Sequence, residues 1–377
     1  MIATTTDRPG RPPPTCYALL GDLPVQHDEL RDEGPHQGHV RLDPVHMRYG
    51  SIPGVGDRVS RLVLGSMVFS TEPDRIDNTF QLLDRFVSVG GTAVDTARVY
   101  AKGSSEPAFG QWLARSGRRD QMVVIGKGAH HDVDTFERRV TPAAIHEDIE
   151  ASLRAMGLES IDIYMLHKDD PDADVGPIVE ALNEEATRGR IKVFGGSSWT
   201  HQRISEANAY ARTHGLRPFT VSSPNLALAV PNEPMWVGCV SIATDDAAQA
   251  WYHQAGMPLF AWSAQARGFF SGRYRPDLTV GQTQDAQNVI RTYYSADNWE
   301  RYRRAGELAQ QKGCTLAQVA LAWVLHQPLN VYALIGPATV AELDDCLGAL
   351  DVELSQEEVA WLNLASTPAS AASVPRG

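Results

Sequence analysis

The sequence of 377 residues lacks the features that mark membrane, zinc-bound and nucleic-acid-binding proteins. No apolar run approaches the roughly 20 residues that would span a bilayer, and the N-terminus has no apolar signal core. The four cysteines are far apart, with no CxxC pair, which is typical of reduced thiols and predicts no metal site. A net charge of −12 argues against a broad nucleic-acid surface. These absences favour a globular cytoplasmic protein.

Lysine is also scarce, with only five among the 34 basic residues. Lys127 follows the apolar run MVVI after a single glycine, Gly126, a position at which lysine is unusual unless it has a partner or a function. Three other polar residues end or follow apolar runs in the same way: Asp95, Tyr100 and His167. A carboxylate, a phenol, an ammonium and an imidazole can form one proton relay, so the pattern predicts acid–base chemistry.

Strand and helix signals alternate regularly from about Met47 onward. The strand candidates are eight short apolar runs, at 61–64, 92–95, 122–125, 161–166, 191–195, 219–222, 258–262 and 331–335. Thr141-Pro142 is typical of a helix start and Gly157 of its end. Eight β-α units favour a (β/α)8 TIM barrel over an open doubly wound sheet, which stays the alternative. We expect residues 1–46 to be a partly disordered extension and 47–377 to be the barrel domain.

Several ordered motifs together resemble the aldo-keto reductase superfamily: DTARVYA, VVIGKG, LHKDDP, GGSSW and ALIGPAT. The resemblance covers about Met47 to Ala365. It implies an NAD(P)H-dependent reduction of an aldehyde, ketone or sugar carbonyl, in which Tyr100 is the general acid. Lys127 would stabilise the phenolate, Asp95 would hold Lys127, and His167 would orient the carbonyl.

The same resemblance assigns cofactor contacts to polar residues after four barrel strands and a stacking aromatic, Trp262. The residues are Ser197, Ser198, Ser223, Trp262, Ser263, Gln265, Arg267, Gly268, Arg273, Gly336, Ala338, Thr339, Glu342 and Cys346. Ala338 stands where the family commonly has a basic residue for the adenosine 2′-phosphate. NADP(H) is nevertheless the predicted cofactor, with NAD(H) open, because an arginine such as Arg273 could hold that phosphate.

Substrate contacts are expected from five aromatic residues that the resemblance places around the barrel mouth: Phe69, Trp112, Trp199, Phe269 and Trp299. Each of them could instead be core, just as Asp95 could cap a turn and His167 could be a satisfied core histidine. The partner is therefore predicted to be a small carbonyl or alcohol, with no nucleic acid and no membrane.

The sequence leaves two other functions open. Lys127 could be a Schiff-base nucleophile in a barrel lyase. Alternatively, the protein could be a nicotinamide-binding sensor or regulatory subunit with little turnover, as some family members are, with residues 1–46 as its partner-binding arm.

Overall fold

The computed structural model describes residues 47–365, and the predicted extension 1–46 lies outside them. Eight parallel strands close into one barrel, in the order β10-β3-β4-β5-β6-β7-β8-β9. Their bounds are β3 Leu62–Gly65, β4 Ala93–Asp95, β5 Val123–Gly128, β6 Ile161–Leu166, β7 Ile191–Ser197, β8 Val221–Ser223, β9 Leu259–Ala261 and β10 Val331–Ile335. The predicted (β/α)8 fold is confirmed, since each strand overlaps one of the eight apolar runs.

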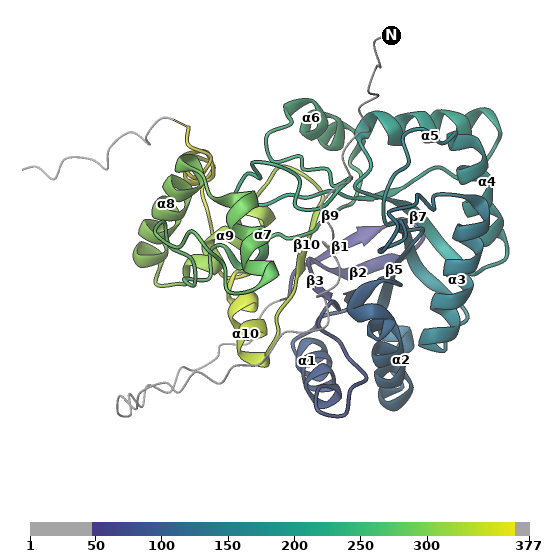
Figure 1. Cartoon of the computed structure of the whole chain (residues 1–377), viewed down its shortest axis with the longest axis horizontal. Helices are drawn as coiled ribbons and strands as arrows, with labels where there is room; N and C mark the ends of the chain where they lie inside the picture. Colours follow the sequence, from purple (N-terminus) through teal and green to yellow (C-terminus); the bar gives the residue numbers. More distant parts are fainter. Residues whose placement is uncertain (1–46, 366–377) are drawn as a thin grey trace, which may run out of the picture.

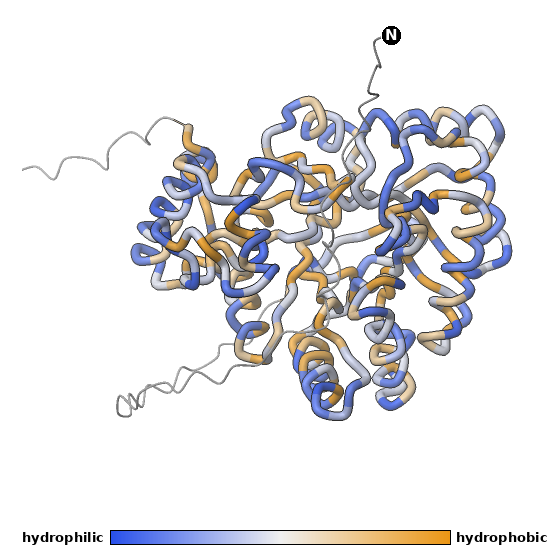
Figure 2. The backbone as a smooth tube through the Cα atoms, in the orientation of Figure 1, coloured by the Kyte–Doolittle hydropathy of each residue, from blue (hydrophilic) through white to orange (hydrophobic). Residues whose placement is uncertain are grey.

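Helices surround the barrel, with α3, α4 and α5 on the side opposite α7, α8 and α9 (Figure 1). Their bounds are α1 Ile76–Ser88, α2 Ser105–Ser116, α3 Pro142–Met156, α4 Val175–Thr187, α5 His201–Thr213, α6 Asp246–Ala255, α7 Gln284–Tyr293, α8 Ala296–Lys312, α9 Leu316–Leu325, α10 Val340–Gly348 and α11 Gln356–Leu362. Hydrophobic segments gather at the barrel and the inward helix faces, while hydrophilic segments lie outside (Figure 2). Within residues 47–365, no helix is long and apolar enough to cross a membrane.

Local signals explain where α3 begins and ends. The Thr141 hydroxyl accepts a hydrogen bond from the Ala144 amide, and Pro142 occupies the first helical turn. Gly157 ends the helix at a φ of 67°, a left-handed conformation that costs glycine little. These are the start and stop positions that the sequence predicts.

An antiparallel hairpin, β1 Tyr49–Ile52 and β2 Gly56–Ser60, precedes the first barrel strand. Its side chains Ile52 and Val59 are almost completely buried and belong to the same apolar cluster as Val63, Ile125 and Phe260 inside the barrel. The hairpin therefore closes the end of the barrel at which the strands begin. Chemistry is left to the opposite end, where the strands finish.

We predict that the contact between β7 and β8 tolerates no side chain at Gly195. A Cβ there would lie 1.8 Å from the Val221 carbonyl oxygen. Gly195→Ala should lower the free energy of unfolding by about 1–3 kcal/mol or more, measured by urea denaturation. Gly306→Ala, within α8 and with nothing within 4 Å, is the matched control and should stabilise the protein by about 0.4–1 kcal/mol. Equal effects of the two variants would contradict the prediction.

Candidate active site

The barrel brings the four predicted relay residues together where neighbouring strands end. Asp95 is the last residue of β4 and Lys127 lies near the end of β5. His167 directly follows β6, and Tyr100 starts the short turn η1 Tyr100–Gly103 after β4. Because β4, β5 and β6 are adjacent and parallel, residues that are far apart in sequence share one face.

Lys127 is the centre of this group. Its Nζ lies 2.5 Å from Asp95 Oδ1 and 2.6 Å from Oδ2, and it donates to the Tyr100 hydroxyl at 3.1 Å. The side chains of Lys127 and Asp95 are each 2% exposed, whereas Tyr100 is only partly buried. The phenol is therefore the member of the relay that can face a ligand.

Burial sets the protonation of these groups. Burial lowers the pKa of Lys127, but Asp95 and Tyr100 more than offset this, so the pKa is raised and the ammonium is kept. Burial raises the pKa of Tyr100, and the opposing effect of Lys127 is smaller. The phenol is therefore protonated at neutral pH. Lys127 lowers the pKa of the phenol, which is the direction that the sequence predicts, although burial has the larger effect.

His167 lies beside the phenol as a neutral ring. Its ring centroid is 5.5 Å from that of Tyr100, with the planes 82° apart. The pKa of His167 lies well below its usual range. Burial of the ring is the main cause, and the charges of nearby histidines and of Lys127 and Lys168 add to it. Its Nδ1 is buried and has no hydrogen-bond partner within residues 47–365. A neutral imidazole here can donate from one nitrogen and accept at the other.

Backbone strain gathers at the same end of the molecule. Among the described residues, non-glycine residues with positive φ are Ala101, Lys102, Ala129, Phe136, Ser198, Ser263, Ala266, Arg267 and Leu364. All but Leu364 follow a barrel strand at its C-terminal end. Such conformations cost about 1–3 kcal/mol each and persist where the surrounding structure imposes them, most often at functional sites.

The predicted cofactor residues after β9 and β10 lie close to one another. Cys346 Sγ on α10 donates to Gln265 Oε1 at 3.3 Å, which joins the two segments. Arg267 pairs with Asp285 and lies over the Trp236 ring, 5.4 Å from its centroid. Arg273 is exposed and has no carboxylate partner within residues 47–365, so it is available to an anion. Ser263 and Gly268 line the same turn, and Gly268 has a φ of 80°.

The start of α10 carries its own carboxylate. Glu342 Oε2 accepts the Ala338 amide at 2.7 Å, and Thr339 Oγ1 accepts the Glu342 amide at 3.2 Å. A carboxylate therefore occupies part of the helix N-terminus that the sequence predicts as a phosphate site. At Gly336, two residues earlier, a Cβ would meet nothing within 4 Å, so open space remains there.

The serines predicted to contact the cofactor are largely engaged with the backbone. Ser197 Oγ donates to the Ser223 carbonyl at 3.2 Å, and Ser198 has a φ of 57°. Ser223 is fully buried and its hydroxyl donates to the Phe260 carbonyl at 2.7 Å. Ser223 therefore offers no surface in this structure. Asn225, not predicted from the sequence, donates to the Trp262 carbonyl at 3.0 Å and fixes the strand end next to that ring.

Four of the five aromatic residues predicted as substrate contacts are core. Phe69, Trp112, Trp199 and Phe269 are each 0% exposed. Trp112 donates to Asp84 on α1, which places its ring between α1 and α2 and away from the barrel mouth. Only Trp299 is partly exposed, and it packs against Phe269 with centroids 4.9 Å apart. For these four residues the structure favours the alternative that they are core, because a resemblance along the sequence does not show whether an aromatic side chain points outward from the barrel or towards its mouth.

Aromatic residues that the sequence does not single out lie closer to the relay. His130 is 4.8 Å from His167 and 4.0 Å from His131 between ring centroids, and Phe136 stacks on His131 at 5.4 Å. The only signal for them is the unusual pair of histidines three residues after Lys127. On another loop, Trp236 lies 6.0 Å from Trp262.

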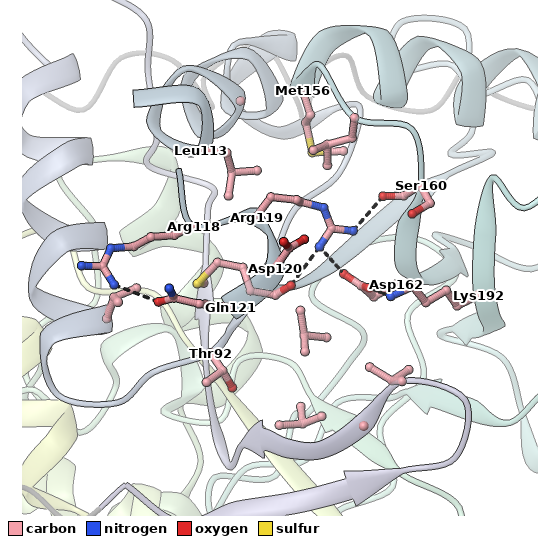
Figure 3. A pocket seen from close by; sticks show the side chains of 18 of the residues that line it. Thr92, Leu113, Arg118, Arg119, Asp120, Gln121, Met156, Ser160, Asp162 and Lys192 are labelled. Atoms are coloured by element: carbon pink, nitrogen blue, oxygen red, sulfur yellow. Dashed lines mark hydrogen bonds and ion pairs between the residues drawn. The ribbon is translucent and has the colours of Figure 1, made fainter. Parts of the chain in front are cut away.

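A large cavity among the described residues lies at the other end of the barrel. It has a volume of about 1340 Å³ and lies between the β1–β2 hairpin and the strand starts (Figure 3). Two of its basic side chains, Arg119 and Lys192, bind Asp162 at 2.9 and 2.6 Å. It contains none of the relay residues, so size alone does not identify the active site.

The chain matches a family model described as the aldo/keto reductase family over residues 61–365. It is 28% identical to norsolorinic acid reductase stcV of Emericella nidulans, covering 81% of this chain and 78% of that protein. It is 27% identical to an aryl-alcohol dehydrogenase [NADP(+)] of Phanerodontia chrysosporium, covering 82% and 83%. A crystal structure of an aldo-keto reductase from Klebsiella pneumoniae in complex with NADPH is similar at a TM-score of 0.64 and 25% identity, covering 86% and 96%.

We predict that Asp95 and Lys127 depend on each other for stability. Asp95→Asn leaves a buried ammonium without its counter-charge and should lower the free energy of unfolding by about 3–5 kcal/mol. The double variant Asp95→Asn, Lys127→Met removes both charges and should be more stable than the single Asp95→Asn variant. Urea denaturation of the wild type, both single variants and the double variant measures this coupling. Simple additivity of the two single effects would contradict it.

Proposed function

Because this chain belongs to the aldo/keto reductase family, we propose that it is a carbonyl reductase in which Tyr100 gives a proton to the carbonyl oxygen. The observation that carries the proposal is the chain of contacts from Asp95 through Lys127 to the Tyr100 hydroxyl at the barrel mouth. Membership of the family makes the protein an oxidoreductase. The roles of the four residues and the substrate class are proposals.

The proton transfer depends on Lys127. When Tyr100 Oη protonates a carbonyl oxygen, negative charge develops on the phenol oxygen, 3.1 Å from the Lys127 ammonium. That charge is therefore stabilised where it forms, without rearrangement of the site. Asp95 keeps the ammonium in place and charged, so the interaction exists before substrate arrives.

His167 supports this transfer as an orienting group. Its neutral ring can donate a hydrogen bond to the same carbonyl oxygen, so that oxygen is held between the imidazole and the phenol. A charged imidazolium would compete with Lys127 for the developing phenolate. The low pKa of His167, which results first from burial, prevents this.

The residues after β9 and β10 fit a nicotinamide dinucleotide. Trp262 has a partly buried ring for stacking, its Nε1 is buried without a partner in the described part of the chain, and Arg273 offers an exposed guanidinium. Open space at Gly336 leaves room for a phosphate near the start of α10. When bound, the cofactor supplies the hydride that adds to the carbonyl carbon.

NADP(H) is the cofactor that the comparisons support. A relative is named an aryl-alcohol dehydrogenase [NADP(+)], and a structure of the same fold is an NADPH complex. Ala338 is uncharged, and the Glu342 carboxylate accepts the Ala338 amide. The adenosine 2′-phosphate of NADP(H) therefore requires a cationic side chain from another segment. Arg273 and Arg267 are the candidates, because both lie on the segment after β9.

For the substrate we propose an extended aromatic aldehyde or ketone. A continuous series of rings leads from Tyr100 through His167, His130 and His131 to Phe136, with neighbouring centroids 4.0–5.5 Å apart. Burial first, then the neighbouring His131, lowers the pKa of His130 to about 3, so its ring is neutral. His130 is only 2% exposed, so a flat aromatic molecule would pack on His167, His131 and Phe136 while its carbonyl reaches the phenol. Names of relatives, including an aryl-alcohol dehydrogenase, agree with this class.

Phe136 is held in a conformation that a bulky residue rarely adopts. Its φ is 60° and it is 40% exposed. Asp132 fixes the turn before it, since Oδ1 accepts from the amides of Asp134 and Thr135 at 3.0 and 2.7 Å. An exposed aromatic with a strained backbone costs stability, and contact with a ligand would explain why it is there.

The lyase hypothesis is disfavoured by the state of Lys127. A Schiff-base nucleophile must be a neutral amine, whereas Lys127 binds a carboxylate and its pKa is raised. The sensor hypothesis predicts cofactor binding with little turnover, whereas the reductase hypothesis predicts turnover. The following measurement distinguishes the two.

We predict that Tyr100→Phe abolishes reduction but not cofactor binding. With NADPH and aromatic aldehydes, kcat should fall by about 10²–10⁴-fold, because the proton donor is lost. The Kd for NADPH, measured by fluorescence, should stay nearly unchanged. Tyr302→Phe on α8, whose hydroxyl makes no hydrogen bond within residues 47–365, is the matched control and should keep full activity.

Two outcomes of this measurement, and one of a separate trapping experiment, would contradict parts of this proposal. Wild-type protein that binds NADPH tightly without turning over any carbonyl would favour the sensor. Turnover that survives in Tyr100→Phe would exclude Tyr100 as the acid. Trapping of a Lys127 adduct by borohydride would restore the lyase.

We also predict that Phe136→Ala weakens the binding of large substrates only. KM for polycyclic aromatic aldehydes should rise by about 2–10-fold, which corresponds to the loss of one aromatic contact. KM for a short aliphatic aldehyde should not change, because such a molecule does not reach Phe136. Val280→Ala, another exposed apolar residue, is the control. An equal rise in KM for both substrates would contradict the proposed wall.

A further inference from the structure

Lys168 is a buried lysine that the proposed mechanism does not use. It follows His167, is only 6% exposed, and its Nζ points at the thiol of Cys239, 3.0 Å from Sγ. The aliphatic part of its side chain passes the loop at Gly238, where a Cβ would lie 3.8 Å from Lys168 Cδ. The cysteine is 71 residues away in sequence, on the loop between β8 and α6.

The carboxylates nearest in sequence do not neutralise Lys168. Asp169 pairs with Arg203 at 3.3 Å and Asp170 pairs with Arg138 at 2.5 Å. No ion pair of Lys168 with a carboxylate occurs within residues 47–365. A buried ammonium without a counter-charge is costly, and the Cys239 sulfur is the group in position to supply one.

The other titratable groups around this pair carry no charge at neutral pH. Burial, and then Lys168, lowers the pKa of His131, and the pKa of His130 is lowered as well. Burial raises the pKa of Tyr293 on α7, and Cys239 contributes a smaller electrostatic effect in the same direction. Lys168 is therefore the cation that the sulfur faces.

We propose that Cys239 is a reactive cysteine held against Lys168 and is a site of modification by hydroperoxides and small electrophiles. Cys239 is partly exposed, so reagents can reach it. A thiolate next to a cation, with access to solvent, is the environment in which cysteines react. The other cysteines within residues 47–365 differ, since burial raises the pKa of Cys314 and raises that of Cys346 to about 12.

The reaction with hydrogen peroxide is balanced. The sulfur attacks one peroxide oxygen, an S–O bond forms and the O–O bond breaks, and the departing hydroxide takes up a proton to give water. The sulfur is oxidised to a sulfenic acid and the peroxide is reduced. No further reactant is needed.

An adduct at Cys239 would reach the candidate active site. Cys239 lines a cavity of about 240 Å³ together with Asn225, Trp262 and Tyr293. Trp262 is the proposed nicotinamide platform, so a group added to the sulfur would fill space beside it. This consequence rests on the proposed function, whereas the reactivity of the thiol does not.

The test measures alkylation of each cysteine in the full chain. Protein is treated with limiting iodoacetamide at neutral pH, quenched over time and analysed by peptide mass spectrometry. Cys239 should be alkylated at least about tenfold faster than Cys314 in the same molecule. In urea, where the Lys168 contact is lost, the two rates should become similar. A native ratio no larger than the ratio in urea would overturn the proposal.

Two substitutions at Lys168 distinguish the effect of the lysine charge on the reactivity of Cys239 from the effect of the exposure of Cys239. Lys168→Met should slow alkylation of Cys239 by about tenfold, while Lys168→Arg, which keeps the charge, should retain most of the rate. If Lys168→Met does not fold, the alkylation rates of Cys239 and Cys314 in native and urea-treated wild-type protein still test the proposal. An unchanged rate in a folded Lys168→Met variant would show that the lysine does not activate the thiol.

The effect on activity is measured separately with hydrogen peroxide. A dimedone-type probe should label Cys239 before Cys314, and reductase activity should be lost in proportion to that label. Cys239→Ser should keep its activity under the same treatment. Labelling of Cys239 without turnover in untreated protein would refute the proposed function while supporting the reactive thiol, and absence of labelling would overturn the thiol proposal.

Discussion

The buried ion pair between Asp95 and Lys127 is the interaction on which the rest of the candidate site depends. An ammonium at the end of β5 is tolerated only because a carboxylate at the end of β4 lies 2.5 Å away. This pair in turn holds the phenol of Tyr100 at hydrogen-bond distance. In the proposed mechanism, a charge that is costly to bury is thus fixed beside the proton donor, so stability and the proposed chemistry rest on the same contact.

The two ends of the barrel divide these tasks. At the end where the strands begin, the β1–β2 hairpin adds Ile52 and Val59 to the interior core, and Asp162 pairs with Arg119 and Lys192. At the other end, loops carry non-glycine residues with positive φ, such as Ser198 and Arg267. Apolar packing at the closed end offsets the strain that the open end requires.

Loops from different strands combine at the open end. The loop after β5 brings His130 and Phe136 toward His167, and the loop after β8 brings Cys239 against Lys168. Both contacts join segments that the sequence separates, because β5 and β6 are neighbours in the barrel and only β7 stands between β6 and β8. The proposed substrate wall and the proposed reactive thiol are therefore properties of the loop arrangement and have no motif of their own.

The sequence by itself determined the barrel and the relay. Short apolar runs alternate with capped helices along the chain. Any closed parallel barrel brings the polar residues at the ends of such runs together, so Asp95 and Lys127 could be found without coordinates. Only the tertiary structure decided which aromatic side chains line the mouth. Trp112 is buried against α1 and Phe136 is exposed, although both are aromatic residues between strands. The reason is physical: strand order follows from local patterns, whereas the direction of a loop side chain depends on contacts with distant segments.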